Sequence, residues 1–198
     1  GGGTPTTLSA SQLDRLLAAA EAHLPLAGCR EMTVEAGRPD TITREKLEVL
    51  REHGIERISI NPQTMSDQVL QAIGRRHTAR DIEDTMALAA SMGFPHVNMD
   101  LIAGLPEDTP EGFRRTLDTC LQCGADNITV HTLSLKKGSR ILLEHLTIPS
   151  AEPWARCWTM PTRRCAPRIS RPTTSTGRNT CPGALKTWLV HIRGRGAV

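Results

Sequence analysis

The chain has 198 residues, enough for one sizeable domain. It contains neither an uncharged apolar stretch of roughly 18 residues nor a basic and apolar leader, so we expect a cytoplasmic protein without a membrane-spanning helix. The formal net charge of +3 averages two unlike parts. Residues 1–152 carry all 21 acidic and 15 of the 24 basic residues, whereas residues 153–198 carry nine basic residues and no acidic one.

Residues 9–133 alternate regularly between helical and extended patterns. Ser9 and Gln12 form a capping box, which predicts an amphipathic helix with the apolar stripe Leu13, Leu16, Leu17 and Ala20. Further helices are predicted to begin at Thr43, Ser66, Thr78 and Thr109. Short strands are predicted at 31–36, 57–60, 96–102 and 127–133. This order is typical of a parallel sheet with right-handed crossovers, and it leaves open a doubly-wound sheet or a (β/α) barrel.

The strand ends carry the candidate functional residues, because both folds bind ligands where parallel strands end. Glu35, Gln63 and Asp100 lie at the carboxyl ends of three of the predicted strands and should face one mouth with the glycine-rich turn at residues 1–6. Taken singly, each is as typical of a capped turn or a solvated charge as of a ligand site. With Arg75 they offer two carboxylates, an amide and a guanidinium, which suit a ligand with a ribose, an ammonium and a carboxylate.

Regular patterning stops near residue 145. We expect a folded part at residues 1–150 and an irregular basic tail at residues 151–198. The tail is either disordered, nucleic-acid-binding or translated out of frame, and we favour the last because Trp and Cys accompany an absence of acids. Nucleic-acid binding is not expected, since the acidic part would repel a phosphate backbone. Cys120 and Cys123 form a CxxC without a second matching pair, which predicts packing thiols rather than a zinc site.

Five motifs follow one another in a recognisable order: GGGTPT, TVEAGRPDTI, RISINPQTM, IGRRHT and VNMDLIAGLPEDTPEGF. Over residues 1 to about 150 the chain resembles the radical S-adenosylmethionine superfamily, in the branch of oxygen-independent coproporphyrinogen III oxidase. Within that branch it is similar to the HemZ-type coproporphyrinogen dehydrogenases. The resemblance implies an α/β fold that is part of a (β/α)6 barrel, comprising strands three to six, followed by the irregular tail.

The resemblance also implies two cofactors, S-adenosylmethionine and a [4Fe–4S] cluster. Carried over to this sequence, Gly2, Gly3 and Thr4 would contact the methionyl end of S-adenosylmethionine. The remaining cofactor-lining residues would be Glu35, Gln63, Arg75, Asp100 and Ser134. The family holds its cluster with a CxxxCxxC loop upstream of the GGGTP turn, and this motif does not occur in the sequence. We therefore expect a fragment that lacks the first two barrel strands.

The function implied for the intact enzyme is the oxidative decarboxylation of porphyrinogen propionates in haem biosynthesis. Two alternatives stay open. Some relatives in this branch carry haem, and His77 and His131 are candidate axial ligands for a haem chaperone. Otherwise the chain is a truncated product without a function.

Overall fold

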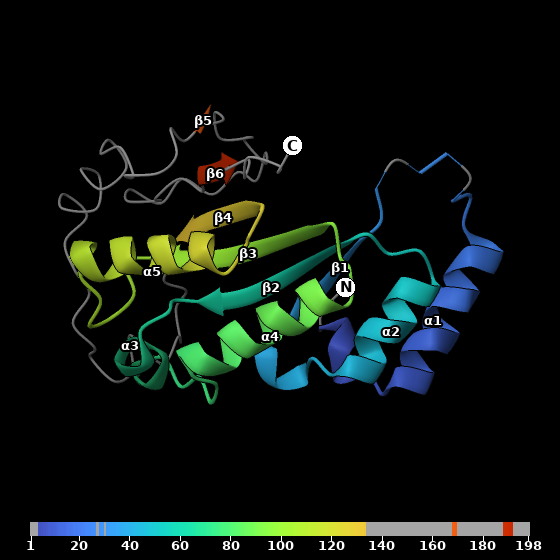
Figure 1. The fold of residues 1–198 in the computed structure, drawn as a ribbon, viewed down its shortest axis with the longest axis horizontal. Helices are drawn as coiled ribbons and strands as arrows, with labels where there is room; N and C mark the ends of the chain where they lie inside the picture. Colours follow the sequence, from blue (N-terminus) through green and yellow to red (C-terminus); the bar gives the residue numbers. More distant parts are fainter. Residues whose placement is uncertain (1–3, 27, 30, 134–167, 170–187, 192–198) are drawn as a thin grey trace, which may run out of the picture.

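The structure is a computed structural model that describes residues 4–26, 28–29, 31–133, 168–169 and 188–191. Its main part is one sheet with helices between consecutive strands (Figure 1). The helices are α1 (Ala10–His23), α2 (Arg44–Glu52), α3 (Asp67–Ala72), α4 (Ala79–Ser91) and α5 (Pro110–Gln122), with short 3-10 turns η1 (Pro5–Thr7) and η2 (Pro39–Thr41). The strands are β1 (Thr33–Gly37), β2 (Arg57–Gln63), β3 (His96–Ala103), β4 (Asn127–Thr132), β5 (Arg168–Ile169) and β6 (Trp188–His191).

The four predicted strands form the expected parallel sheet. Its strand order is β1-β2-β3-β4-β6-β5, and β1 to β4 pair in parallel as neighbours. A run of parallel strands joined by helices in sequence order confirms the α/β class and the crossover topology.

Local capping explains where the helices begin. The Ser9 hydroxyl accepts from the Gln12 N–H and the Gln12 side chain accepts from the Ser9 N–H, which is the predicted capping box. Thr78 opens α4 in the same way with Asp81. One part of the first prediction is wrong, because Leu16 is 50% exposed rather than part of a buried stripe. Only Leu13 is fully buried on α1, which packs against α2 at the margin of the fold.

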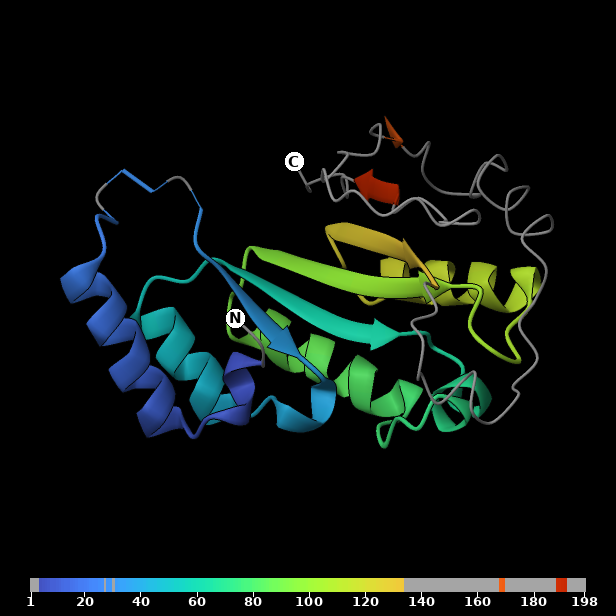
Figure 2. The same cartoon turned by 180° about the vertical axis from the view of Figure 1, so that it is seen from behind.

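The two faces of the sheet differ in chemistry. The helices α4 and α5 lie on one face, in front of the sheet in Figure 1 and behind it in Figure 2. Apolar side chains fill the space between this face and the helices, among them Ile58, Ile60, Met99, Leu101, Ile128, Val130 and Phe113. Burial of this apolar surface is the main stabilising contribution to the fold.

The opposite face is polar. Alternate residues of the strands point there, and we call this surface the polar face: Glu35, Ser59, Asn61, Asn98, Asp100, Asn127, Thr129 and His131. A doubly-wound sheet has helices on both faces and strands that are apolar on both. Strands with one apolar and one polar face instead fit the wall of an open barrel.

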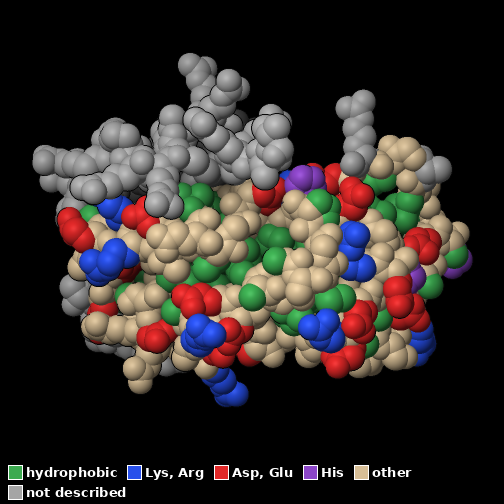
Figure 3. All heavy atoms as spheres, viewed as in Figure 1, with side chains coloured by type: hydrophobic (Ala, Val, Ile, Leu, Met, Phe, Trp, Pro, Cys, Tyr) green, Lys and Arg blue, Asp and Glu red, His purple; other side chains and the backbone are tan. Residues whose placement is uncertain are grey.

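The outer surface over the helices is mixed. In Figure 3 acidic and basic side chains are interspersed over this side of the described residues, as expected of a solvated helical layer. No helix in the part of the chain that the structure describes is long and apolar enough to cross a membrane.

Two short strands belong to the segment that the sequence predicts to be irregular. β6 pairs antiparallel with β4, and β5 pairs antiparallel with β6. These six residues are extended, contrary to the absence of a strand pattern there. The predicted boundary at residue 150 lies outside the described residues and stays a prediction.

Candidate functional site

The polar face brings together residues from four strands. The register pairs Glu35 with Ser59, Ser59 with Asn98 and Asn98 with Asn127, which makes one row across the sheet. Asp100 and Thr129 are paired one step further toward the carboxyl ends of their strands. Because paired residues of parallel strands point to the same side, these side chains share one surface.

Asn61 lies between the two carboxylates of this surface. Its Nδ2 lies 3.5 Å from Oε2 of Glu35. With the amide turned round, the nitrogen donates instead to Oδ2 of Asp100 at 3.1 Å and to Oγ of Ser59 at 3.3 Å. We prefer the turned amide, because the other orientation leaves its oxygen facing acceptors only. In this orientation the Asn61 nitrogen bonds Asp100 and Ser59 rather than Glu35, and Glu35 and Asp100 are neighbouring carboxylates without a shared donor.

The electrostatics of Glu35 reflect this arrangement. Partial burial, and next to it the charge of Asp100, raise the pKa of Glu35 above its ordinary value of 4.5. The charge of His131 on β4 acts in the opposite direction.

Gln63 ends β2 in a strained conformation. Its φ is +72°, in the left-handed region that residues with a Cβ rarely adopt, and the register of β2 against β3 shifts between Ile60 and Gln63. The side chain is buried, and its Nε2 donates to the backbone oxygen of Asn61 at 3.4 Å. Strain of this kind concentrates at ligand-binding positions, so it marks the end of β2 as a candidate for one.

The turn that precedes α1 is fastened to the end of β1. The Thr6 hydroxyl donates to the backbone oxygen of Ala36 and lies 2.8 Å from the Thr41 hydroxyl. Nζ of Lys46 donates to the backbone oxygens of Thr6 at 2.6 Å and Thr41 at 2.9 Å. The turn is thereby held beside Gly37, the last residue of β1.

Gly37 is the point of closest approach between this turn and β1. Its φ is +72°, and a Cβ added there would lie 2.2 Å from Cγ2 of Thr4. Only a glycine permits this packing. Thr4 is therefore placed at the same end of the strand as Glu35, as the sequence predicts. Gly2 and Gly3 lie outside the described residues.

The charged neighbours of Arg75 differ from those of the carboxylate cluster. It is half-buried after α3, and burial lowers its pKa, with a smaller contribution from the charge of Arg38. The charge of Asp40 acts in the opposite direction. These neighbours belong to the loop after β1, so Arg75 lies near the carboxyl end of β1 but is not part of the Glu35–Asp100 cluster. Ser134 lies outside the described residues.

His77 does not fit the exposed ligand that the sequence suggests. The side chain is 4% exposed, and its Nε2 donates to the backbone oxygen of Pro62 at 3.4 Å. Burial lowers its pKa, so the neutral ring is favoured. His131 is half-buried on the polar face and remains the more accessible of the two histidines.

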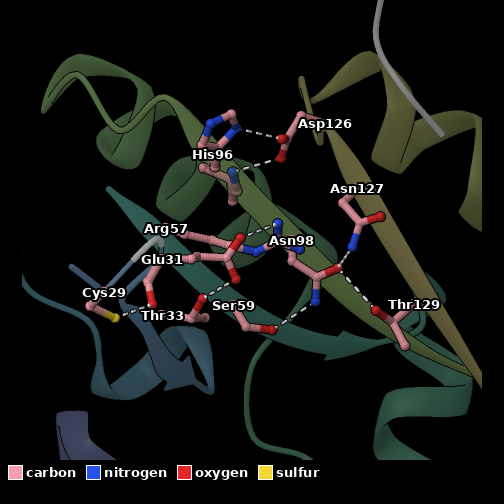
Figure 4. A network of polar contacts seen from close by, with 11 residues as sticks. Cys29, Glu31, Thr33, Arg57, Ser59, His96, Asn98, Asp126, Asn127 and Thr129 are labelled. Carbon is pink, nitrogen blue, oxygen red and sulfur yellow. Dashed lines mark hydrogen bonds and ion pairs between the residues drawn. The ribbon is translucent and has the colours of Figure 1, made fainter. Parts of the chain in front are cut away.

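Sequence reasoning missed the polar residues beside the carboxylates. Asn98 donates to Oγ of Ser59 at 2.9 Å and accepts from Asn127 and Thr129 (Figure 4). It also donates to Oδ1 of Asp100 at 2.7 Å. The available signal was the alternation of polar residues along three strands: Ser59 with Asn61, Asn98 with Asp100, and Asn127 with Thr129. A search restricted to the strand ends does not detect this alternation.

The described cysteines do not form a cluster site. Cys120 is fully buried in the core, and burial raises the pKa of its thiol, as expected of a packing residue. Cys29 is exposed before β1 and its Sγ donates to the backbone oxygen of Glu31. Within the described ranges, no group of three His, Cys, Asp or Glu side chains is arranged to hold a metal ion. These residues do not fit an iron–sulfur cluster.

The acceptors on the polar face do fit a cationic, hydroxyl-rich ligand. Two carboxylates, a backbone turn and a buried amide are partners for ammonium and ribose hydroxyl groups. A hollow of about 320 Å³ beside η2 and α4, and one of about 260 Å³ at the amino-terminal edge of the sheet, are not lined by Glu35 or Asp100.

Comparison with known proteins decides the family. The model described as the Radical SAM superfamily matches residues 1–120 of this chain. The chain belongs to the radical SAM superfamily. Within it, the chain is 45% identical over 142 residues to the oxygen-independent coproporphyrinogen-III oxidase-like protein HemZ of Bacillus subtilis, covering 71% of this chain and 28% of HemZ. It is 37% identical over 134 residues to the heme chaperone HemW of the same organism, covering 67% of this chain and 35% of HemW.

The fold of this chain resembles a solved radical SAM barrel. The coproporphyrinogen III oxidase HemN of Escherichia coli superposes with a TM-score of 0.71 at 27% identity, over 80% of this chain and 37% of HemN. This confirms the predicted resemblance to the HemN-like branch and to its radical SAM barrel. The chain spans about a third of the length of the relatives that it matches.

Proposed function

We propose that this chain is the S-adenosylmethionine-binding part of a radical SAM enzyme that oxidatively decarboxylates the propionates of a porphyrinogen. The observation that carries the proposal is the pair of carboxylates, Glu35 and Asp100, which lie close enough on the polar face for the charge of Asp100 to raise the pKa of Glu35. The similarity to HemZ and HemN supports the substrate class. It leaves HemW-like haem binding as the second candidate.

The residues of the site have separable roles in this proposal. Glu35 and Asp100 accept hydrogen bonds from the ammonium and the ribose hydroxyls of S-adenosylmethionine. Gly2, Gly3 and Thr4 would contact its methionyl end, and Gln63 and Ser134 would contact the rest of the ligand, by the resemblance to the family. Arg75, at the carboxyl end of β1, pairs with the carboxylate of the methionyl group. When bound, S-adenosylmethionine supplies the radical chemistry of the family.

A binding measurement tests the proposal on the chain itself. We expect the 198-residue chain to bind S-adenosylmethionine in isothermal titration calorimetry. Charge-assisted hydrogen bonds contribute about 1.5–3 kcal/mol each, so Glu35→Gln with Asp100→Asn should weaken binding by at least about tenfold. Glu31→Gln is the matched control, because Glu31 is an exposed carboxylate before β1 that pairs with Arg57, the first residue of β2. Equal affinity of the double variant and the wild-type chain would contradict the proposal.

A second experiment separates the enzyme from the chaperone. His131 on the polar face is the described histidine best placed to bind haem iron. If the chain is a haem carrier, added haemin should give a Soret band that His131→Ala removes. A decarboxylase-type site should instead bind the porphyrinogen precursor and leave the haemin spectrum unchanged.

A further inference from the structure

Beside the carboxylates, the polar face carries further polar side chains that the proposed function does not use. Ser59, Asn98 and Asn127 are 1%, 6% and 6% exposed, and Thr129 is half-buried beside them. Buried polar groups are kept only when their hydrogen bonds are made. The four come from β2, β3 and β4 and meet at Asn98 (Figure 4).

The hydrogen bonds of Asn98 determine which way its amide points. Its Oδ1 accepts from Nδ2 of Asn127 and from Oγ1 of Thr129, the latter at 3.0 Å. The carboxylate of Asp100 only accepts, so the nitrogen of the Asn98 amide faces Asp100 and the oxygen faces Asn127 and Thr129. Nδ2 of Asn98 donates to Oγ of Ser59 at 2.9 Å and to Oδ1 of Asp100 at 2.7 Å.

Both oxygens of Asp100 are held by amides in consequence. Asn98 donates to Oδ1, and the turned amide of Asn61 donates to Oδ2 at 3.1 Å. Ser59 accepts from both amides and so ties them together. An aspartate that is hydrogen-bonded at both oxygens keeps one rotamer in the absence of ligand. Ligand binding then costs less side-chain conformational entropy.

We infer that Asn98, oriented by Thr129 and Asn127, is a positioning residue that holds the Asp100 carboxylate in its binding conformation. The inference rests on the proposed function, since it assigns a purpose to Asp100 as a ligand contact. Thr129 on β4 thereby acts on the ligand through Asn98 and does not contact the ligand itself.

Thr129→Val tests this relay, because valine keeps the shape of threonine and removes the donor to Asn98. Binding of S-adenosylmethionine should weaken about three- to tenfold, and Thr129→Ser should restore it. Thr85→Val is the matched control: Thr85 is a buried threonine on α4 whose hydroxyl donates to the Asp81 backbone oxygen. That variant should leave the affinity unchanged.

A double-variant cycle separates positioning from general damage. In an Asp100→Asn background, Thr129→Val should cause no further loss, because the relay acts only through the Asp100 carboxylate. Two results would refute the relay while the proposed function stands, provided that the wild-type chain binds. Thr129→Val could bind as tightly as the wild-type chain, or Thr129→Val could weaken binding by the same factor with and without Asp100→Asn.

A measurement without ligand decides the case in which the wild-type chain fails to bind. Three-bond couplings of Asp100 should report a single χ1 rotamer in the wild-type chain and an averaged one in Thr129→Val. With that result and no binding, the proposed function fails and the positioning of Asp100 stands. Averaged couplings in the wild-type chain would overturn the relay whatever binds.

Discussion

Gly37 offers the sharpest test of how the amino-terminal turn meets the sheet. Gly37→Ala adds a Cβ that would lie 2.2 Å from Cγ2, 2.9 Å from Oγ1 and 3.2 Å from Cβ of Thr4. The residue also has a φ of +72°, which costs a residue with a Cβ about 1–2 kcal/mol. Overpacking adds about 1–3 kcal/mol. The free energy of unfolding should therefore fall by about 2–5 kcal/mol.

Gly93→Ala separates the two contributions. Gly93 has a nearly equal φ of +70°, and a Cβ there would have no atom within 4 Å. We expect this variant to lose only the backbone part, about 1–2 kcal/mol. Urea unfolding followed by far-ultraviolet circular dichroism measures both variants.

Removing the opposing atoms should rescue Gly37→Ala. Thr4→Ala deletes the two nearest atoms of Thr4, so the double variant should recover most of the difference between Gly37→Ala and Gly93→Ala. Equal losses for Gly37→Ala and Gly93→Ala, with no coupling to Thr4, would refute the packing of the turn against β1.

Three other predictions follow from the described contacts. Hydrogen bonds that the ring of His53 donates to the carboxylates of Asp14 and Glu21 raise the pKa of His53 above 6.5, so the stability they add is fully present below pH 6.5 and is lost as the pH rises through the folded-state pKa. His53→Gln should flatten this part of the pH dependence of urea midpoints. Asp100→Asn should lower the pKa of Glu35 toward its ordinary value, seen in a carbon-13 titration of the Glu35 carboxyl, and an unchanged titration would contradict the carboxylate cluster. Thr6→Val leaves the Ala36 carbonyl without its donor and should cost about 1–3 kcal/mol in urea unfolding, whereas Thr7→Val, at an exposed hydroxyl, should cost less.

Much of the fold could be predicted from local signals. Capping side chains at Ser9, Thr43, Thr78 and Thr109 act within one turn of sequence, and each bonds the N–H three residues on, as expected. Glu35 and Asp100 could be paired because parallel strands end at the same edge of a sheet. The sequence also distinguishes a barrel from a doubly-wound sheet, because polar Asn98 and Asp100 alternate with apolar Met99 along one strand. The order of helices and strands, which is the same in both folds, does not contain this information.

Other features depend on tertiary geometry that no local pattern contains. The path of the loop after α3 decides that Arg75 meets Arg38 and Asp40 rather than the carboxylate cluster, and that His77 is buried under Pro62. The left-handed conformation of Gln63 coincides with the register shift between β2 and β3 and runs against the preference of a residue with a Cβ. The pairing of β6 with β4 joins residues about 60 positions apart, beyond the reach of periodicity.

A crystal structure of the chain grown with S-adenosylmethionine would test the central claim most directly. We predict ligand density on the polar face, with the carboxylates of Glu35 and Asp100 within hydrogen-bonding distance of its ammonium or ribose hydroxyls. Density on the helical side of the sheet, with both carboxylates free of the ligand, would contradict the account.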